Sequence, residues 1–293
     1  MPLGVIAPEV TALRRAERLL KGAKDVPSLP AATLRVLAML RDPDTSAARI
    51  AQVVTTDPGL TARLLCLANS AYYGYARRIA TVTEAAVLLG SDALRSVVLT
   101  ASARATLSQP LRGYGCSQEG LWRHSVWTAT AARLLEARVR PALAEQAFVA
   151  GLLHDVGKIV IAANHGEQFV SICRKVEREG KSFAEAEAEV LGCSHAEIGG
   201  VLAQQWRLPE SLAEAVTYHH APAAAEVDVA LAAAVQVADA LVLSLGVGAV
   251  PEVRAREISE SALPLARVPA AVLLSVREEV PQSAAELERL VEE

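Results

Sequence analysis

The residues best suited to chemistry are six histidines between positions 124 and 220, with acidic residues beside them. His154 is followed directly by Asp155, His219 is followed by His220, and Asp239 stands inside an otherwise apolar segment. A single histidine on a helix is usually structural or exposed, and adjacent His-Asp or His-His pairs occur by chance. Asp239 is more unusual, because burying a carboxylate without a partner is costly. It therefore requires a cation or a hydrogen-bond donor.

Together these residues supply nitrogen and oxygen donors from five expected helical segments. The seven candidate metal ligands are His124, His154, Asp155, His195, His219, His220 and Asp239. Imidazoles and carboxylates on facing helices are the usual components of metal sites in helical bundles. Mixed nitrogen and oxygen donors suit first-row divalent metals such as Fe, Mn, Co, Ni or Zn. Seven donors exceed the needs of one tetrahedral ion, so they favour two ions bridged by a carboxylate.

Paired divalent ions are a common device for phosphoester hydrolysis, in which one ion activates water and both stabilise charge on the phosphate. Lys158 follows Asp155 by three residues and shares its helix face. It could contact a phosphate oxygen or assist the leaving group, or it could be an ordinary surface lysine. We take Asp155 and Lys158 as candidate catalytic residues. A purely structural metal is the alternative, since a catalytic site keeps one position open for water.

His165 is the one histidine that does not fit this set. It precedes Gly166 at an expected helix end, and we expect it to have no role in the site.

The elements that position these residues are expected to be helices. The chain has 293 residues, of which 52% are hydrophobic and only 4% aromatic, and it is rich in the strong helix formers alanine and leucine. No strand-like alternation is visible. Asp57-Pro58 is a helix start, and one helix capped by Thr83 should end at Gly90. In the second half the expected helices cover 120–138, 143–163, 166–179, 182–191, 194–206, 209–219 and 227–246.

A cluster of helix-breaking residues divides the chain in two. Pro110, Gly113, Gly115 and Gly120 fall within a dozen residues, which is typical of a loop or boundary. We therefore expect an all-α fold in which an N-terminal helical lobe packs on a helical bundle. The expected parts are an N-terminal helix (1–22), the lobe (23–112), the metal-binding bundle (113–250) and C-terminal helices (251–293).

Composition argues against several classes of protein. The net charge of −4 and the lack of a basic stripe argue against nucleic-acid binding. The four cysteines form no CxxC pair, as expected for reduced thiols in the cytoplasm. The apolar stretch 229–250 contains Gln236 and Asp239 near its middle. A buried helix of a soluble protein fits this stretch better than a membrane span.

Several short motifs, in this order, resemble the HDOD domain family. They are Pro27-Ser28-Leu29-Pro30, Asp42-Pro43-Asp44, Asp57-Pro58-Gly59-Leu60, the run Leu67 to Gly74, the run Gly151 to Lys158, and Tyr218-His219-His220. HDOD domains are related to HD-domain phosphohydrolases and to the HD-GYP phosphodiesterases of cyclic di-GMP. The resemblance implies an all-α protein of bacterial signalling, and many members have lost the metal ligands.

The resemblance also implies how the donors are shared between two ions, with Asp155 as the bridge. One ion would be held by His124, His154, Asp155 and Asp239, and the other by Asp155, His195, His219 and His220. Lys158 matches the lysine that follows His-Asp in HD-GYP proteins. The chain departs from HD-GYP after His220, where no Gly-Tyr-Pro loop follows. Cyclic di-GMP is therefore not the expected substrate.

Two functional hypotheses follow. The first is a cytoplasmic signalling module that keeps a site for one or two divalent ions (Fe, Mn or Zn) and acts through a protein partner or a bound nucleotide. The second is a metal-dependent phosphohydrolase or phosphodiesterase acting on a nucleotide or cyclic nucleotide. Neither involves nucleic acid or a membrane, and a homodimer is an open alternative.

Overall fold

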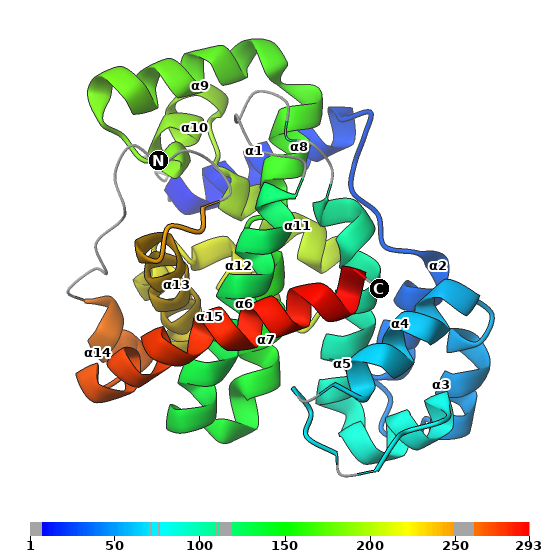
Figure 1. The fold of residues 1–293 in the computed structure, drawn as a ribbon. Coiled ribbons are helices and arrows are strands. Elements are labelled where there is room, and N and C mark those ends of the chain that lie inside the picture. Colours follow the sequence, from blue (N-terminus) through cyan, green and yellow to red (C-terminus); the bar gives the residue numbers. More distant parts are fainter. Residues whose placement is uncertain are drawn as a thin grey trace, which may run out of the picture.

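The computed structural model describes residues 8–292, except for 71, 76, 109–110, 112–118 and 249–260. Throughout this described part the regular elements are helices and no strand occurs, which confirms the all-α fold (Figure 1). The expected boundary at Pro110 and Gly113 lies outside the described residues, so the division into parts stays a prediction. Gly120 is the first residue of a helix.

The described residues of the first half form five helices, and the last three of them begin at side-chain caps. The five are α1 (Pro8–Gly22), α2 (Ala31–Met39), α3 (Ala47–Val54), α4 (Pro58–Ala68) and α5 (Val82–Leu107). Asp57 accepts a hydrogen bond from the backbone N–H of Leu60, as its position before Pro58 predicts. The prediction that Thr83 caps the next helix is wrong. Thr81 caps it instead, because its hydroxyl accepts from the N–H of Glu84.

The second half holds the remaining helices. They are α6 (Gly120–Val139), η1 (Pro141–Leu143), α7 (Ala144–Leu153), α8 (Gly157–Asn164), α9 (Gly166–Glu179), α10 (Phe183–Leu191), α11 (His195–Gln205), α12 (Glu210–Tyr218), η2 (Pro222–Ala224), α13 (Val229–Ser244), α14 (Ala262–Ala266) and α15 (Ala270–Glu292). The single helix predicted over 143–163 is in fact two helices, α7 and α8. The turn between them holds His154 and Asp155.

Helix α6 lies at the centre of the second half and packs against α7, α13 and α15. In Figure 1, α15 crosses in front of α6 and α7 and ends near α4 and α5. Its residues Val276, Val280 and Ala284 are fully buried, and the Sγ of Cys66 on α4 lies 3.5 Å from the carbonyl oxygen of Leu290. The C-terminal helix therefore covers the bundle, as expected, and also reaches the first half.

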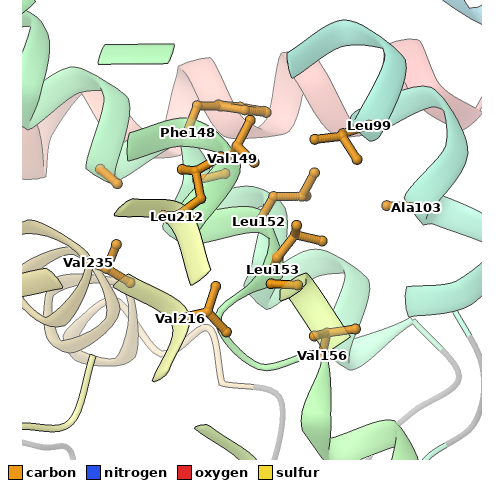
Figure 2. Close-up of a cluster of buried hydrophobic side chains, with 14 of the residues drawn as sticks. Leu99, Ala103, Phe148, Val149, Leu152, Leu153, Val156, Leu212, Val216 and Val235 are labelled. Carbon is orange, nitrogen blue, oxygen red and sulfur yellow. The ribbon is translucent and has the colours of Figure 1, made fainter. Parts of the chain in front are cut away.

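A continuous apolar core joins the two halves. Figure 2 shows Leu99 and Ala103 of α5 beside the α7 side chains Phe148 and Leu152, with Val216 of α12 on the other side of α7. All five are at most 2% exposed. Full burial of each of the larger side chains among them stabilises the folded state by about 1.5–3 kcal/mol. Helix α7, which ends directly before His154, is therefore held from both halves of the chain.

The turn after α4 adds a polar contact between the halves. The guanidinium of Arg133 on α6 lies 4.1 Å from the centre of the Tyr72 ring, and its Nε donates to Glu145 of α7 at 2.8 Å. Tyr72 also meets the ring of Phe148 edge-on. Tyr72 of the Leu67 to Gly74 motif thus packs on α6, which carries His124, and on α7, which His154 directly follows.

Close approach between helices depends on glycines that have no room for a side chain. A Cβ on Gly157, the first residue of α8, would lie 2.0 Å from the carbonyl oxygen of His195. A Cβ on Gly151 of α7 would lie 2.8 Å from the Cα of Ala129 on α6. These glycines allow the backbones that carry the candidate ligands to touch.

Two helical stretches, Val82–Arg104 and Pro141–Asn164, are long and apolar enough to cross a membrane. They are 61% and 83% buried inside the protein. Burial of this extent is typical of core helices in soluble proteins.

Candidate metal centre

The seven predicted donors lie together in the interior of the second half. His124 is on α6, His154 and Asp155 are in the turn after α7, and His195 is the first residue of α11. His219 and His220 directly follow α12, and Asp239 is on α13. Six of the seven are at most 6% exposed, and His220 is half-buried. Five segments that are far apart in sequence thus converge on one buried, donor-rich centre.

One group of donors surrounds His124. Its Nε2 atom lies 3.1 Å from Oδ1 of Asp239 and 3.2 Å from Nε2 of His154. These three residues form one set whose ligand atoms are close enough to share an ion. The Oδ2 atom of Asp155 lies 3.5 Å from Nε2 of each of the two histidines.

A second group lies on the other side of Asp155. Nε2 of His195 is 3.2 Å from Oδ1 of Asp155 and 2.9 Å from Nε2 of His220. His219 completes this set with His195 and His220, and it also forms a set with His154 and Asp155. The two oxygens of Asp155 thus face the two groups, which is the arrangement that a bridging carboxylate requires.

Hydrogen bonds to backbone carbonyls fix the orientation of three rings. The Nδ1 atoms of His124, His154 and His219 lie 3.0, 2.7 and 2.7 Å from the carbonyl oxygens of Val247, Gly151 and Val216. A carbonyl oxygen only accepts, so Nδ1 carries the hydrogen in each ring. The Nε2 atoms are left to face the centre, as in histidines that ligate metals.

The contact between Nε2 of His124 and Nε2 of His154 requires an added proton or a cation, because both rings already carry their hydrogen on Nδ1. Facing imidazole nitrogens repel one another unless a proton or a metal ion lies between them. The nearby carboxylates also favour positive charge on His195. Burial lowers the pKa of this imidazole, but the carboxylates of Glu187 and Asp155 outweigh burial and raise the pKa to about 9. The residues therefore fit a cation, and the mixed nitrogen and oxygen donors fit a first-row divalent metal.

His219 gives independent support for this fit. Its Nε2 atom is buried and has no hydrogen-bond partner within the described residues. Burial and the neighbouring His154 and His195 hold the pKa of His219 well below its usual value, so the ring is neutral and Nε2 offers a lone pair. An unpaired buried acceptor is costly, and a bound metal ion removes that cost.

Lys158 is not an ordinary surface lysine. It is 5% exposed, and its Nζ donates to Oδ2 of Asp155 at 2.6 Å. With burial opposing them, His154, Lys158 and His195 hold the pKa of Asp155 well below its usual range. Lys158 therefore keeps Asp155 charged and oriented. Its catalytic role stays a prediction.

Glu187 belongs to the site although sequence reasoning missed it. It is fully buried, and its Oε2 accepts hydrogen bonds from Nδ1 and from the backbone N–H of His195. It is the middle one of three glutamates at alternate positions, between Glu185 and Glu189. The sequence alone therefore does not distinguish it from the other two. Its position four residues after the buried Phe183 puts it on the apolar face of α10, and an acid on such a face is the signal that could have identified it.

His165 lies where the sequence predicted, at the end of α8. It takes part in none of the three sets of donors found among the described residues.

The sequence matches a known domain family over about two thirds of its length. The sequence profile of the HDOD domain matches residues 26–222. A protein of Treponema pallidum (strain Nichols), named "Uncharacterized protein", is 27% identical over 197 residues, which are 67% of this chain and 38% of that protein. The chain therefore spans well under half the length of this relative.

Solved structures match over nearly the whole chain. An HDOD domain protein of unknown function from Geobacter sulfurreducens has a TM-score of 0.78 at 27% identity, covering 96% of this chain and 98% of that one. A protein of Shewanella amazonensis SB2B with the name "Putative phosphohydrolase" has a TM-score of 0.69 at 24% identity, covering 93% and 97%. The second likeness concerns the fold alone.

Proposed function

Because the chain belongs to the HDOD family, we propose that it is a bacterial signalling module of the cytoplasm whose second half binds two divalent metal ions. The observation that carries this proposal is the position of Asp155, whose two carboxylate oxygens each face a different group of histidines. A carboxylate between two groups of nitrogen donors is how paired divalent ions are held.

The proposed division of the ligands is the one that the family resemblance implies. Asp155 would be shared; His124, His154 and Asp239 would complete one set, and His195, His219 and His220 would complete the other. Bound ions at this place would act as Lewis acids and lower the pKa of a water molecule. Fe, Mn and Zn are the metals that this mixture of ligands suits.

The surroundings of the centre favour a regulatory role over turnover. Six of the seven donors are at most 6% exposed, which resembles a closed site more than an open catalytic one. Lys158 already pairs with Asp155. Among the described residues, none that lines the cavity adjoining His220 is an aspartate, glutamate, lysine or arginine. A signal would then pass by binding a nucleotide or a partner protein.

Hydrolysis of a nucleotide phosphoester is the second candidate function, and one observation favours it. His220 is half-buried and lines a cavity of about 410 Å³, so one side of the centre is accessible to a ligand. Turnover of nucleotide monoesters and cyclic dinucleotides by the metal-loaded protein, absent in Asp155→Ala, would establish this function in place of the regulatory one.

Metal content tests the proposal directly. We expect about two equivalents of Fe, Mn or Zn per chain by elemental analysis of protein purified without a metal-affinity tag, as a two-metal site requires. Asp155→Ala should lose them, and the matched variant His165→Ala should retain them. Empty wild-type protein after incubation with each metal would refute the proposal.

A further inference from the structure

A second cavity, the Arg78 cavity, lies where α4, the segment before α5 and the end of α15 meet. It measures about 930 Å³, near the upper end of the range of about 300–1,000 Å³ that is typical of binding pockets. Its apolar lining comes from Leu65, Ile79 and Leu290, which are buried or half-buried. None of the seven candidate metal ligands lines it. The Arg78 cavity is therefore separate from the metal centre.

Two exposed arginines give this cavity a positive charge. Arg77 and Arg78 both line it, and among the described residues no aspartate or glutamate does. Arg77 is partly compensated, because its guanidinium lies 2.8 Å from a carboxylate oxygen of Glu84 on α5. Arg78 takes part in none of the ion pairs that the described residues form. Since the whole chain has a net charge of −4, an acidic group is attracted to this cavity and repelled by much of the remaining surface.

The backbone on either side of the arginines is fixed by hydrogen bonds. Before them, the hydroxyl of Tyr75 donates to the carbonyl oxygen of Leu88 at 2.6 Å. After them, the side-chain amide of Asn69 donates to the carbonyl oxygen of Ile79 at 2.8 Å and accepts from its N–H at 2.7 Å. A surface that is ordered in advance loses less conformational entropy when a ligand binds.

The surface around this cavity has the composition of a protein interface. Tyr75 lines the cavity and is exposed, and Val87, next to the Leu88 that Tyr75 contacts, is 68% exposed. Tyrosine and arginine are enriched at protein interfaces and supply much of their binding energy, with apolar side chains buried in pockets at the centre. An exposed tyrosine and two arginines beside an apolar cavity therefore fit a polypeptide better than a small anion.

We propose that the Arg78 cavity docks a segment of a partner protein in which acidic residues lie next to a large apolar side chain. The apolar side chain enters between Leu65, Ile79 and Leu290, and the acidic residues pair with Arg77 and Arg78. The proposal names the kind of partner for the signalling role proposed above and rests on that role, but not on bound metal. Leu290 belongs to α15, which packs on α6, so the docked segment contacts the helix that covers the metal-bearing bundle.

Selection of short random peptides displayed on phage, with the full chain as target, tests this docking surface. We expect the selected peptides to combine aspartate or glutamate with a large apolar residue. Fluorescence polarisation of the labelled peptides then measures their affinities. Added salt should weaken their binding, because interactions between exposed charges are screened.

Charge reversal at Arg78 separates this surface from the rest of the protein. Arg78→Glu should weaken binding of the selected peptides by roughly tenfold or more, because it places like charges opposite one another. Arg174→Glu, at an exposed residue of α9, makes the same change in net charge and should bind as the wild type does. Ala62→Phe, at an exposed residue that lines the cavity, fills the space for the apolar side chain and should also weaken binding.

Cys66 provides a readout at the cavity itself. Because this residue lines the cavity, a saturating amount of a selected peptide should slow its alkylation by iodoacetamide, measured by mass spectrometry. The half-buried Cys173 of α9 should react at an unchanged rate and is the internal control.

Several results would overturn the docking surface. They are failure to select any peptide, selected peptides without acidic residues, and equal affinities of the Arg78→Glu and Arg174→Glu variants. Binding of inorganic phosphate that depends on Arg78, without selection of acidic peptides, would show a small-anion site instead. Metal content, measured on the same preparations, reports on the metal centre separately. Metal-loaded protein that binds no peptide leaves the metal centre intact, and metal-free protein that binds acidic peptides leaves the docking surface intact.

Discussion

Glu187 of α10 holds His195 of α11 by two hydrogen bonds, one of 2.6 Å from the Nδ1 atom and one of 2.7 Å from the backbone N–H. The three other histidines with assigned Nδ1 contacts bond to carbonyl oxygens, so His195 alone among these four has a carboxylate as its Nδ1 partner. A carboxylate increases the basicity of the imidazole and fixes the ring with Nε2 toward the centre.

We expect Glu187→Ala to weaken metal binding by about 10- to 100-fold, the usual effect of losing such a partner. Glu187→Gln should lie nearer the wild type, because its amide oxygen can still accept from Nδ1. Competition with a chromogenic chelator measures the affinities. Glu189→Gln, an exposed acid on the same helix, is the control. Equal affinities of the Glu187→Ala and Glu189→Gln variants would show that Glu187 does not position His195 for metal.

The contact between Gly157 and His195 predicts a steric defect. A methyl group at position 157 would lie 2.0 Å from the carbonyl oxygen of His195 and 2.9 Å from the backbone nitrogen of Gly199. Backbone atoms cannot rotate away, so α8 and α11 would have to separate. We expect Gly157→Ala to lower the free energy of unfolding by about 3 kcal/mol, the upper end of the usual cost of overpacking, and to reduce metal content by separating Asp155 from His195.

Chemical denaturation compares this variant with Gly166→Ala. A Cβ on Gly166 meets nothing within 4 Å, so that variant should unfold at the same denaturant concentration as wild type. Similar stability of the two variants would mean that α8 and α11 adjust without cost.

The sequence predicted the helices and the donor set because both depend on local patterns. Asp57-Pro58 is a local start signal for α4, and Gly90, with φ of 72°, interrupts α5 at the predicted residue. His154-Asp155 was found by its motif. The motif did not predict the turn in which His154 and Asp155 lie. The apolar run over 143–163 continues through the break between α7 and α8, so the sequence pattern indicated a single helix there.

Features that depend on long-range packing could not be predicted. Glu187 and Glu189 lie in the same alternating run, and only the packing of α10 on its neighbours makes one buried and the other exposed. Lys158 left both a surface and a site role open, because its burial depends on elements that are far away in sequence. The cavity lined by His220 and Gln236 depends on α14, which is about 25 residues further along the chain than Gln236.

An ion cluster at the C-terminal end of α6 predicts a second effect on stability. The carboxylate of Glu136 on α6 is fully buried, and Arg140 pairs with it at 2.7 Å and with Asp228 at 3.0 Å. Asp228 in turn caps α13 by accepting from the N–H of Leu231. Arg140→Met leaves a buried carboxylate without its cation, and we expect it to lower the free energy of unfolding by about 3–5 kcal/mol.

A double variant tests whether that loss comes from the isolated charge. Adding Glu136→Gln to Arg140→Met removes the uncompensated carboxylate, so urea denaturation should recover at least half of the lost stability. If the double variant is no more stable than Arg140→Met, the single variant acts through lost packing of the arginine stem instead.

Metal removal should destabilise the folded protein, because ions bound only by the native state stabilise it by mass action. At a free metal concentration of about 100 times the dissociation constant, each site adds about 2.7 kcal/mol. We expect a chelator to lower the midpoint of thermal unfolding in the wild type and to have no effect on Asp155→Ala, which cannot bridge two ions. The metal-free wild type should also be less stable than its own reloaded form. A chelator effect of the same size in both proteins would place the bound metal outside this centre.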